Sequence, residues 1–184
     1  MITYPTAAEY LPFYNTYIQL VPKGQDPLEQ LRQQPATIKT LLGNLTEEQA
    51  LFRYATGKWS IKESLVHIID SERIFAYRAL RISRGDQTPL PGFEQDDYVP
   101  ASDADARPLA NILHEYSAVR AATLSLFDSF TPETYERSGI ASGGPLTVRA
   151  LAYMIPGHEA HHIRLFRERY LPGLSLSTDA VRFA

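Results

Sequence analysis

Ser60-Ile61-Lys62-Glu63 begins the segment that decides the fold of this chain. The Ser60 hydroxyl can accept a hydrogen bond from the Glu63 amide while the Glu63 carboxylate reaches back to the Ser60 amide, which is the capping box of a helix N-terminus. Apolar residues then recur at spacings of three, four and seven, and Gly85 ends the run: Ile61, Leu65, Ile68, Phe75, Ala79 and Ile82. The pattern predicts one amphipathic helix of about 24 residues.

Three other segments show the same helical periodicity. They span residues 27–42, 108–130 and 147–170. Four amphipathic helices predict an all-α fold, a four-helix bundle, and the length of 184 residues fits one domain over residues 1–184. The aromatic stretch 1–24 is expected to form a short helix across the bundle, and Gly139 to Pro145 is expected to be a turn before the last helix.

The connection from Gly85 to Arg107, between the second and third helices, is unusually long. It contains Pro89-Leu90-Pro91-Gly92-Phe93. Loops of this length in compact domains are commonly functional or cover a site. We therefore expect this segment to act as a lid.

Composition excludes several classes of function. The formal net charge of −3 provides no positive electrostatic field that would attract nucleic acid, so we expect no nucleic-acid partner. The chain has no cysteine, which excludes disulfides, thiolate ligands and a cysteine nucleophile. No stretch approaches the roughly 20 apolar residues of a membrane span, and the first residues lack the pattern of a signal peptide. These features predict a cytoplasmic protein without a membrane partner.

His158-Glu159-Ala160-His161-His162 carries the strongest chemical signal. Residues four apart share one face of a helix, so His158 and His162 can reach one metal ion, whereas His161 points about 100° away. His67, on the helix that starts at Ser60, can supply a third imidazole. Three imidazoles leave positions open for water or substrate, as in catalytic metal sites. A solvated or capping histidine pair is the alternative reading of the same spacing.

Two residues near these histidines have open roles. Glu72 falls in the apolar stripe of its helix, where a carboxylate either orients a histidine, as a supporting or acid/base residue, or pairs with an arginine. Pro156 either bends the last helix just before His158 or marks its start.

His67 lies on the flank of its helix with Ser71, Ile74 and Arg78, where it can line a groove. Trp59, just before the cap, is expected to act as a hydrophobic staple.

Several motifs together resemble the DinB-like superfamily. They are Lys58-Trp59-Ser60-Ile61-Lys62-Glu63, His67, Asp70-Ser71-Glu72-Arg73, the stretch Arg84 to Phe93, and Gly157-His158-Glu159-Ala160-His161-His162. The resemblance implies a four-helix bundle in which His67, His158 and His162 bind a divalent metal, often nickel or zinc. Members include transferases that use bacillithiol-type thiols, a mycothiol-dependent isomerase, and relatives labelled as metal-dependent hydrolases. Pro156 departs from the usual pattern.

We therefore expect a metal-dependent enzyme whose partners are a small-molecule thiol and an electrophilic substrate. Metal-dependent hydrolysis is the first alternative, with Glu72 or a tyrosine handling protons. A non-catalytic metal-binding or scaffold bundle is the second. No organic cofactor is expected, because no phosphate-binding glycine loop is present. Related bundles commonly pair, so we also expect a homodimer.

Overall fold

The structure is a computed structural model that describes residues 1–174. The domain prediction of 1–184 extends beyond them, and residues 175–184 lie outside the described part. The helices and strands run in this order: η1 Ala7–Glu9, η2 Pro12–Tyr14, α1 Asn15–Ile18, α2 Pro27–Leu42, α3 Glu47–Ala50, α4 Ile61–Ser83, α5 Gln95–Ala101, η3 Ala104–Ala106, α6 Leu109–Asp128, η4 Pro132–Glu136, β1 Ser138–Ala141, β2 Gly144–Thr147, α7 Val148–Leu165 and η5 Phe166–Tyr170.

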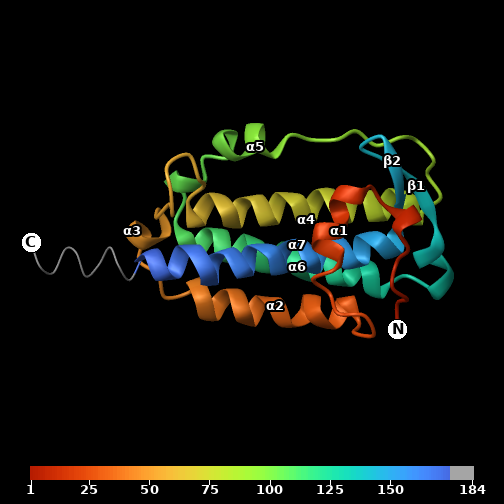
Figure 1. The fold of residues 1–184 in the computed structure, drawn as a ribbon, viewed down its shortest axis with the longest axis horizontal. Helices are drawn as coiled ribbons and strands as arrows, with labels where there is room; N and C mark the ends of the chain where they lie inside the picture. The colour runs from red at the N-terminus through yellow and green to blue at the C-terminus, as the bar shows by residue number, and fades with distance from the viewer. Residues whose placement is uncertain (175–184) are drawn as a thin grey trace, which may run out of the picture.

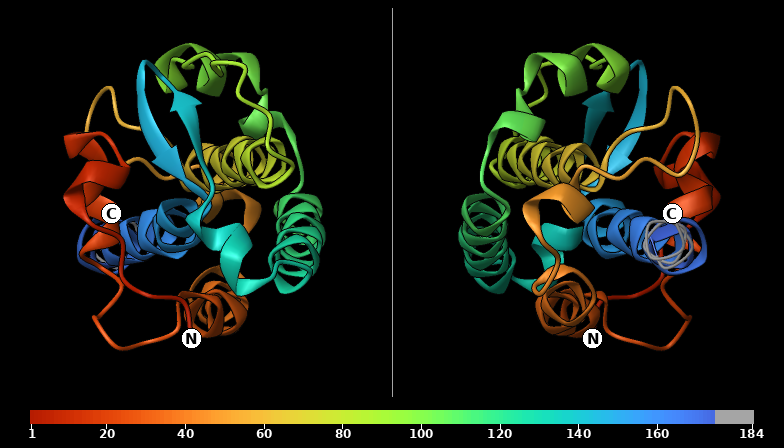
Figure 2. Two further views of the ribbon diagram at one scale, coloured as in Figure 1. Left: turned by 90° about the vertical axis from the view of Figure 1, so that its right-hand side faces the viewer. Right: turned by 90° about the vertical axis from the view of Figure 1, so that its left-hand side faces the viewer.

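Four long helices, α2, α4, α6 and α7, form the predicted four-helix bundle (Figures 1 and 2). The helix predicted from the capping box is present as α4: the Glu63 amide donates to Ser60 Oγ at 3.0 Å, and the Ser60 amide donates to Glu63 Oε2 at 2.8 Å. Within residues 1–174, no helix combines the length and apolarity that a membrane crossing requires.

A buried polar layer separates two apolar clusters in the core. Arg120, on α6, donates from Nε and Nη2 to the carboxylate of Glu72 on α4, at 3.0 and 2.8 Å, and from Nη2 to Glu159 on α7. Tyr116 donates to Glu159 Oε1 at 2.6 Å, and Arg120 Nη1 donates to the Leu31 carbonyl at 2.8 Å. The layer therefore ties all four helices of the bundle together at mid-length.

The chain between the long helices differs from the expectation in two places. Residues 138–147 form an antiparallel hairpin, with Ser138 opposite Thr147, rather than a simple turn. The long segment after Gly85 is also partly helical, because it contains α5 and η3. Its start is fixed to the hairpin, since the Leu90 amide donates to the Ile140 carbonyl at 2.9 Å.

The N-terminal segment packs across the bundle as expected, with α1 lying against α7 (Figure 2). A β-carbon built on Gly157 would overlap the carbonyl of Tyr17, so a glycine is needed for this close approach. Helix α7 runs from Val148 to Leu165 through Pro156, which excludes the alternative in which the helix begins at this proline.

Candidate metal centre

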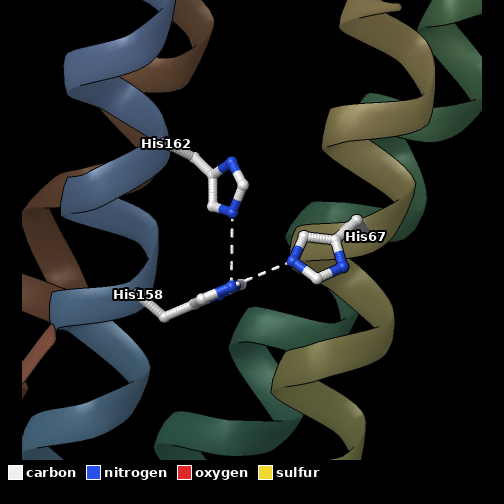
Figure 3. A group of neighbouring side chains, drawn as sticks. All are labelled: His67, His158 and His162. Carbon is white, nitrogen blue, oxygen red and sulfur yellow. Dashed lines mark hydrogen bonds between the residues drawn. The ribbon is translucent and has the colours of Figure 1, made fainter. Parts of the chain in front are cut away.

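His67 from α4 and His158 and His162 from α7 converge in the interior of the bundle (Figure 3). The Nε2 atom of His158 lies 3.0 Å from Nε2 of His67 and 3.2 Å from Nε2 of His162. One ligand atom from each of the three residues lies within 4.8 Å of the others. The structure thus brings together all three histidines that the motif and helix spacing predicted.

The donor set fits a divalent metal ion. The three ligand atoms are all imidazole nitrogens, and two of their separations, 3.0 and 3.2 Å, are short enough for one ion to be shared by each pair. A neutral imidazole Nε2 is either a donor or an acceptor, so His158 cannot satisfy both neighbours by hydrogen bonds at once. His67, His158 and His162 would hold such an ion through these nitrogens, which would remove the conflict.

Burial keeps these imidazoles neutral, the form that binds metal. Desolvation, with a smaller contribution from His161, lowers the pKa of His67 to about 4. Desolvation also lowers the pKa values of His158 and His162 well below the ordinary histidine value, reinforced by the neighbouring histidines. Protons therefore compete little with a metal at neutral pH.

Aromatic rings pack against two of the three imidazoles, those of His67 and His158. The ring centroid of Tyr17, on α1, lies 5.0 Å from that of His158 in an edge-on arrangement, and Phe75 on α4 lies 6.0 Å from His158. The ring of Trp59 lies 4.7 Å from that of His67. Trp59 therefore contacts a candidate ligand directly, a role that the staple interpretation missed. Tyr17 was predicted only as one member of the aromatic stretch 1–24, which was expected to line the open face of the site.

Glu72 pairs with an arginine, which was the second of its two proposed roles. Both of its oxygens accept from Arg120, and no hydrogen bond joins it to a histidine in the described part of the chain. Only 3% of Glu72 is exposed. This placement suits a structural carboxylate and disfavours an acid/base role.

Two clefts adjoin the histidines. The first has a volume of about 560 Å³ and is lined by His67, His162 and His161 together with Lys58, Trp59 and Tyr170, among others. The second, of about 500 Å³, is lined by His158 and by Phe13, Tyr14, Phe75, Phe93 and Ser142, among others. Tyr17, Gln95 and Asp96 line both clefts. The long segment after Gly85 therefore reaches the candidate metal centre through α5.

Comparison with known proteins identifies the family. The model of the DinB superfamily matches residues 30–166, which include all three histidines. The chain belongs to the DinB superfamily. This agrees with the resemblance carried by the motifs around Ser60, His67 and His158.

Relatives of this DinB-superfamily chain support a metal-dependent activity by name. OB0413 of Oceanobacillus iheyensis is 23% identical over 138 residues, covering 74% of this chain and 79% of that protein, and its name proposes a metal-dependent hydrolase. A Bacillus licheniformis protein whose name proposes the same activity is 26% identical over 137 residues, which cover 72% of this chain and 77% of that protein.

A solved structure shares the fold. YfiT from Bacillus subtilis, described as a probable metal-dependent hydrolase with an unusual four-helix bundle topology, aligns with a TM-score of 0.67 and 16% identity. The alignment covers 96% of this chain and 94% of YfiT. At this identity the match establishes the common fold.

Proposed function

We propose that this chain is a divalent-metal-dependent enzyme that joins a low-molecular-weight thiol to a small electrophile at His67, His158 and His162. The observation that carries the proposal is the presence of two clefts beside the three histidines, one lined by His67 and His162 and the other by His158. A transferase must hold two organic reactants near one centre, whereas hydrolysis requires one reactant and water. Each cleft has the size of a site for a small organic molecule.

A bound divalent ion would act as a Lewis acid and lower the pKa of a thiol or water held beside it. The chain's own residues position and shield the reactants. Tyr17 stands at the boundary of the two clefts and packs on His158, and Trp59 packs on His67, so both rings restrict water around the histidines. The thiol must come from solution, because the chain has no cysteine.

The two clefts differ in character. In the first, the hydroxyl of Tyr170 lies 3.0 Å from Ser64 Oγ, and Lys58 adds a positive charge at the wall. We assign the polar thiol to this cleft. The second cleft has aromatic walls formed by Phe13, Tyr14, Phe75 and Phe93, and we assign the electrophile to it.

Hydrolysis is the second candidate, and the names of the relatives favour it. The three histidines would serve it equally well, because both reactions need neutral nitrogen ligands and an open position. A non-catalytic scaffold is less consistent with the structure, since open clefts adjoin the site. The decisive difference between the two enzymes is whether the product contains the thiol.

The experiment offers metal-loaded protein both kinds of substrate. The protein is incubated with a thiol and an alkylating electrophile, and separately with a panel of esters and amides. Thiol transfer predicts a thioether product whose rate depends on thiol concentration and falls after chelation. Metal-dependent ester or amide cleavage without thiol incorporation would favour the hydrolase instead. Failure of both reactions across the panels would support the scaffold.

Three further features belong to the same proposal. We take the ion to be nickel or zinc, because a set of three imidazole nitrogens suits both metals. We place the protein in the cytoplasm. We also propose a homodimer, to which exposed apolar side chains such as Leu51 and Leu80 can contribute. Sedimentation at 20.7 kDa at micromolar concentration would contradict the dimer.

A further inference from the structure

Arg78 is a buried cation without a carboxylate partner. Only 2% of it is exposed, and it forms no ion pair with any aspartate or glutamate among residues 1–174. The other arginine buried to this degree, Arg120, has two carboxylates. Buried charges are normally paired, because taking a charge out of water costs several kcal/mol. Arg78 therefore has a positive charge available for a ligand.

Neutral oxygens surround Arg78 instead. Its Nη2 donates to the Pro91 carbonyl at 2.8 Å and to Ser142 Oγ at 3.0 Å, and its Nη1 lies 3.5 Å from the Tyr14 hydroxyl oxygen. Its guanidinium also lies 5.9 Å from the centroid of Phe93. Tyr14, Phe93 and Ser142 all line the second cleft. Arg78 thus stands directly behind one wall of that cleft.

The two hydroxyls at this wall can donate into the cleft. Ser142 Oγ and the Tyr14 hydroxyl accept hydrogen bonds from Arg78 and use lone pairs to do so, which leaves the hydrogen of each hydroxyl available. A hydroxyl that accepts from a cation becomes a stronger donor. The wall therefore favours a ligand group that accepts hydrogen bonds and carries negative charge.

The backbone at Ser142 is strained. Its φ is +53°, in the left-handed region, at the turn of the hairpin where asparagine or glycine is preferred. A non-glycine residue keeps this backbone conformation only when other interactions hold it there. The hydrogen bond from Arg78 is one such interaction. This hydrogen bond holds the Ser142 hydroxyl at the wall of the cleft.

The wall and the histidines lie at opposite ends of one helix face. His67, Ser71, Phe75 and Arg78 follow one another on α4 at spacings of four, four and three, so they share a face. Arg78 lies about 16 Å beyond His67 along the axis, and its side chain leans back toward the helix N-terminus. Ser71 and Phe75, which lie between them on this face, line the second cleft.

We propose that the second cleft binds a substrate with an aromatic body and a terminal carboxylate. The carboxylate accepts from the hydroxyls of Ser142 and Tyr14 in front of Arg78, the body lies along Phe75 and Phe93, and the other end faces His158. Glu94 and Asp96 also line this cleft, but both side chains are exposed, so solvent screens their charges. The placement of the substrate's other end at His158 rests on the function proposed above, whereas the carboxylate site does not.

The test compares three probes of the same shape. Isothermal titration measures binding of 3-phenylpropanoate, its neutral amide 3-phenylpropanamide, and the cation 3-phenylpropylamine. Because a carboxylate can also bind an ion at the histidines, each titration is run before and after treatment with a chelator. We expect the carboxylate to bind about tenfold more tightly than the amide under both conditions.

Variants decide whether the wall causes this preference. Ser142→Gly removes the hydroxyl while supplying a residue that prefers positive φ, so the fold is retained. Together with Tyr14→Phe, it should reduce the preference for the carboxylate to less than about twofold. Tyr77→Phe, which removes an exposed hydroxyl from α4 away from the cleft, should leave the preference unchanged.

Four results would overturn the carboxylate site: no binding of 3-phenylpropanoate, equal binding of the amide, tighter binding of the amine, or an unchanged preference in the double variant. If the protein prefers the carboxylate but binds no metal, the carboxylate site stands and the proposed function is wrong. If the protein is a metal-dependent enzyme without this preference, the proposed function stands and the carboxylate site is wrong.

Discussion

The carbonyl of Tyr17 occupies the position that a β-carbon on Gly157 would take. This contact brings α1 against α7 one residue before His158, and the ring of Tyr17 then packs edge-on against that histidine, with centroids 5.0 Å apart. Gly157 therefore affects the candidate metal centre by letting the N-terminal segment approach α7 closely. It allows the ring that separates the two clefts to reach the candidate metal centre.

Gly157→Ala should displace α1 and loosen Tyr17 from His158. Because backbone atoms must move, we expect a loss of about 1–3 kcal/mol in the free energy of unfolding, measured with urea. Gly92→Ala is the matched control, since a β-carbon there meets only the Ser142 side chain at ordinary contact distances of 3.6 and 3.9 Å. Equal effects of the two substitutions would show that the contact at Tyr17 is not critical.

Arg120→Met should destabilise the protein strongly. It leaves Glu72 and Glu159 buried without a countercharge, and removing one partner of such a network costs about 3–5 kcal/mol. Arg32→Met is the control, because the ion pair of Arg32 with Asp128 is exposed and is expected to contribute less than about 1 kcal/mol. Similar losses in urea unfolding would contradict the role of the buried layer.

The metal-free protein should lose stability as pH falls from about 6.5 to 4. The folded-state pKa of His67 is lowered to about 4, so the unfolded chain takes up its proton first and is favoured by acid over this range. A shift of this size corresponds to about 3 kcal/mol, and His158 and His162 act in the same direction. Urea unfolding of His67→Asn should show a shallower dependence on pH. A wild-type stability that is constant over this range would contradict the burial of neutral imidazoles.

The segment that carries α5 should affect turnover without affecting metal binding. Gln95 and Asp96 line both clefts, so Gln95→Ala combined with Asp96→Asn should change kcat or KM while metal content stays constant. Asp97→Asn is the control, because Asp97 does not line either cleft. If the double substitution and the control give the same kinetics, the lid role is wrong.

Local signals in the sequence predicted much of the fold and the site. The capping box at Ser60 located the start of α4, and the spacing of His158 and His162 located two nitrogens on one helix face. These features depend on neighbours within four residues. The helical spacing also predicted that His67, Ser71 and Arg78 share one flank of their helix and can line a groove. Ser71 does line the second cleft.

Features that depend on distant segments were not predictable in this way. Tyr17 contacts His158 across most of the chain, and no local pattern distinguishes it from the other tyrosines of residues 1–24. The hairpin was missed because its turn uses Ser142, with positive φ, where asparagine or glycine is the usual signal. Helix α5 was missed because the prolines around it suggested an irregular loop.

The most direct test of the account is the metal content of untagged protein, measured by elemental analysis and metal titration. The account predicts one nickel or zinc ion per chain in the wild type, loss of that ion in His67→Ala, His158→Ala and His162→Ala, and retention in His161→Ala, because His161 lies beside the cluster of three without belonging to it. A wild-type protein that binds no divalent ion, or an equal loss in His161→Ala, would contradict it.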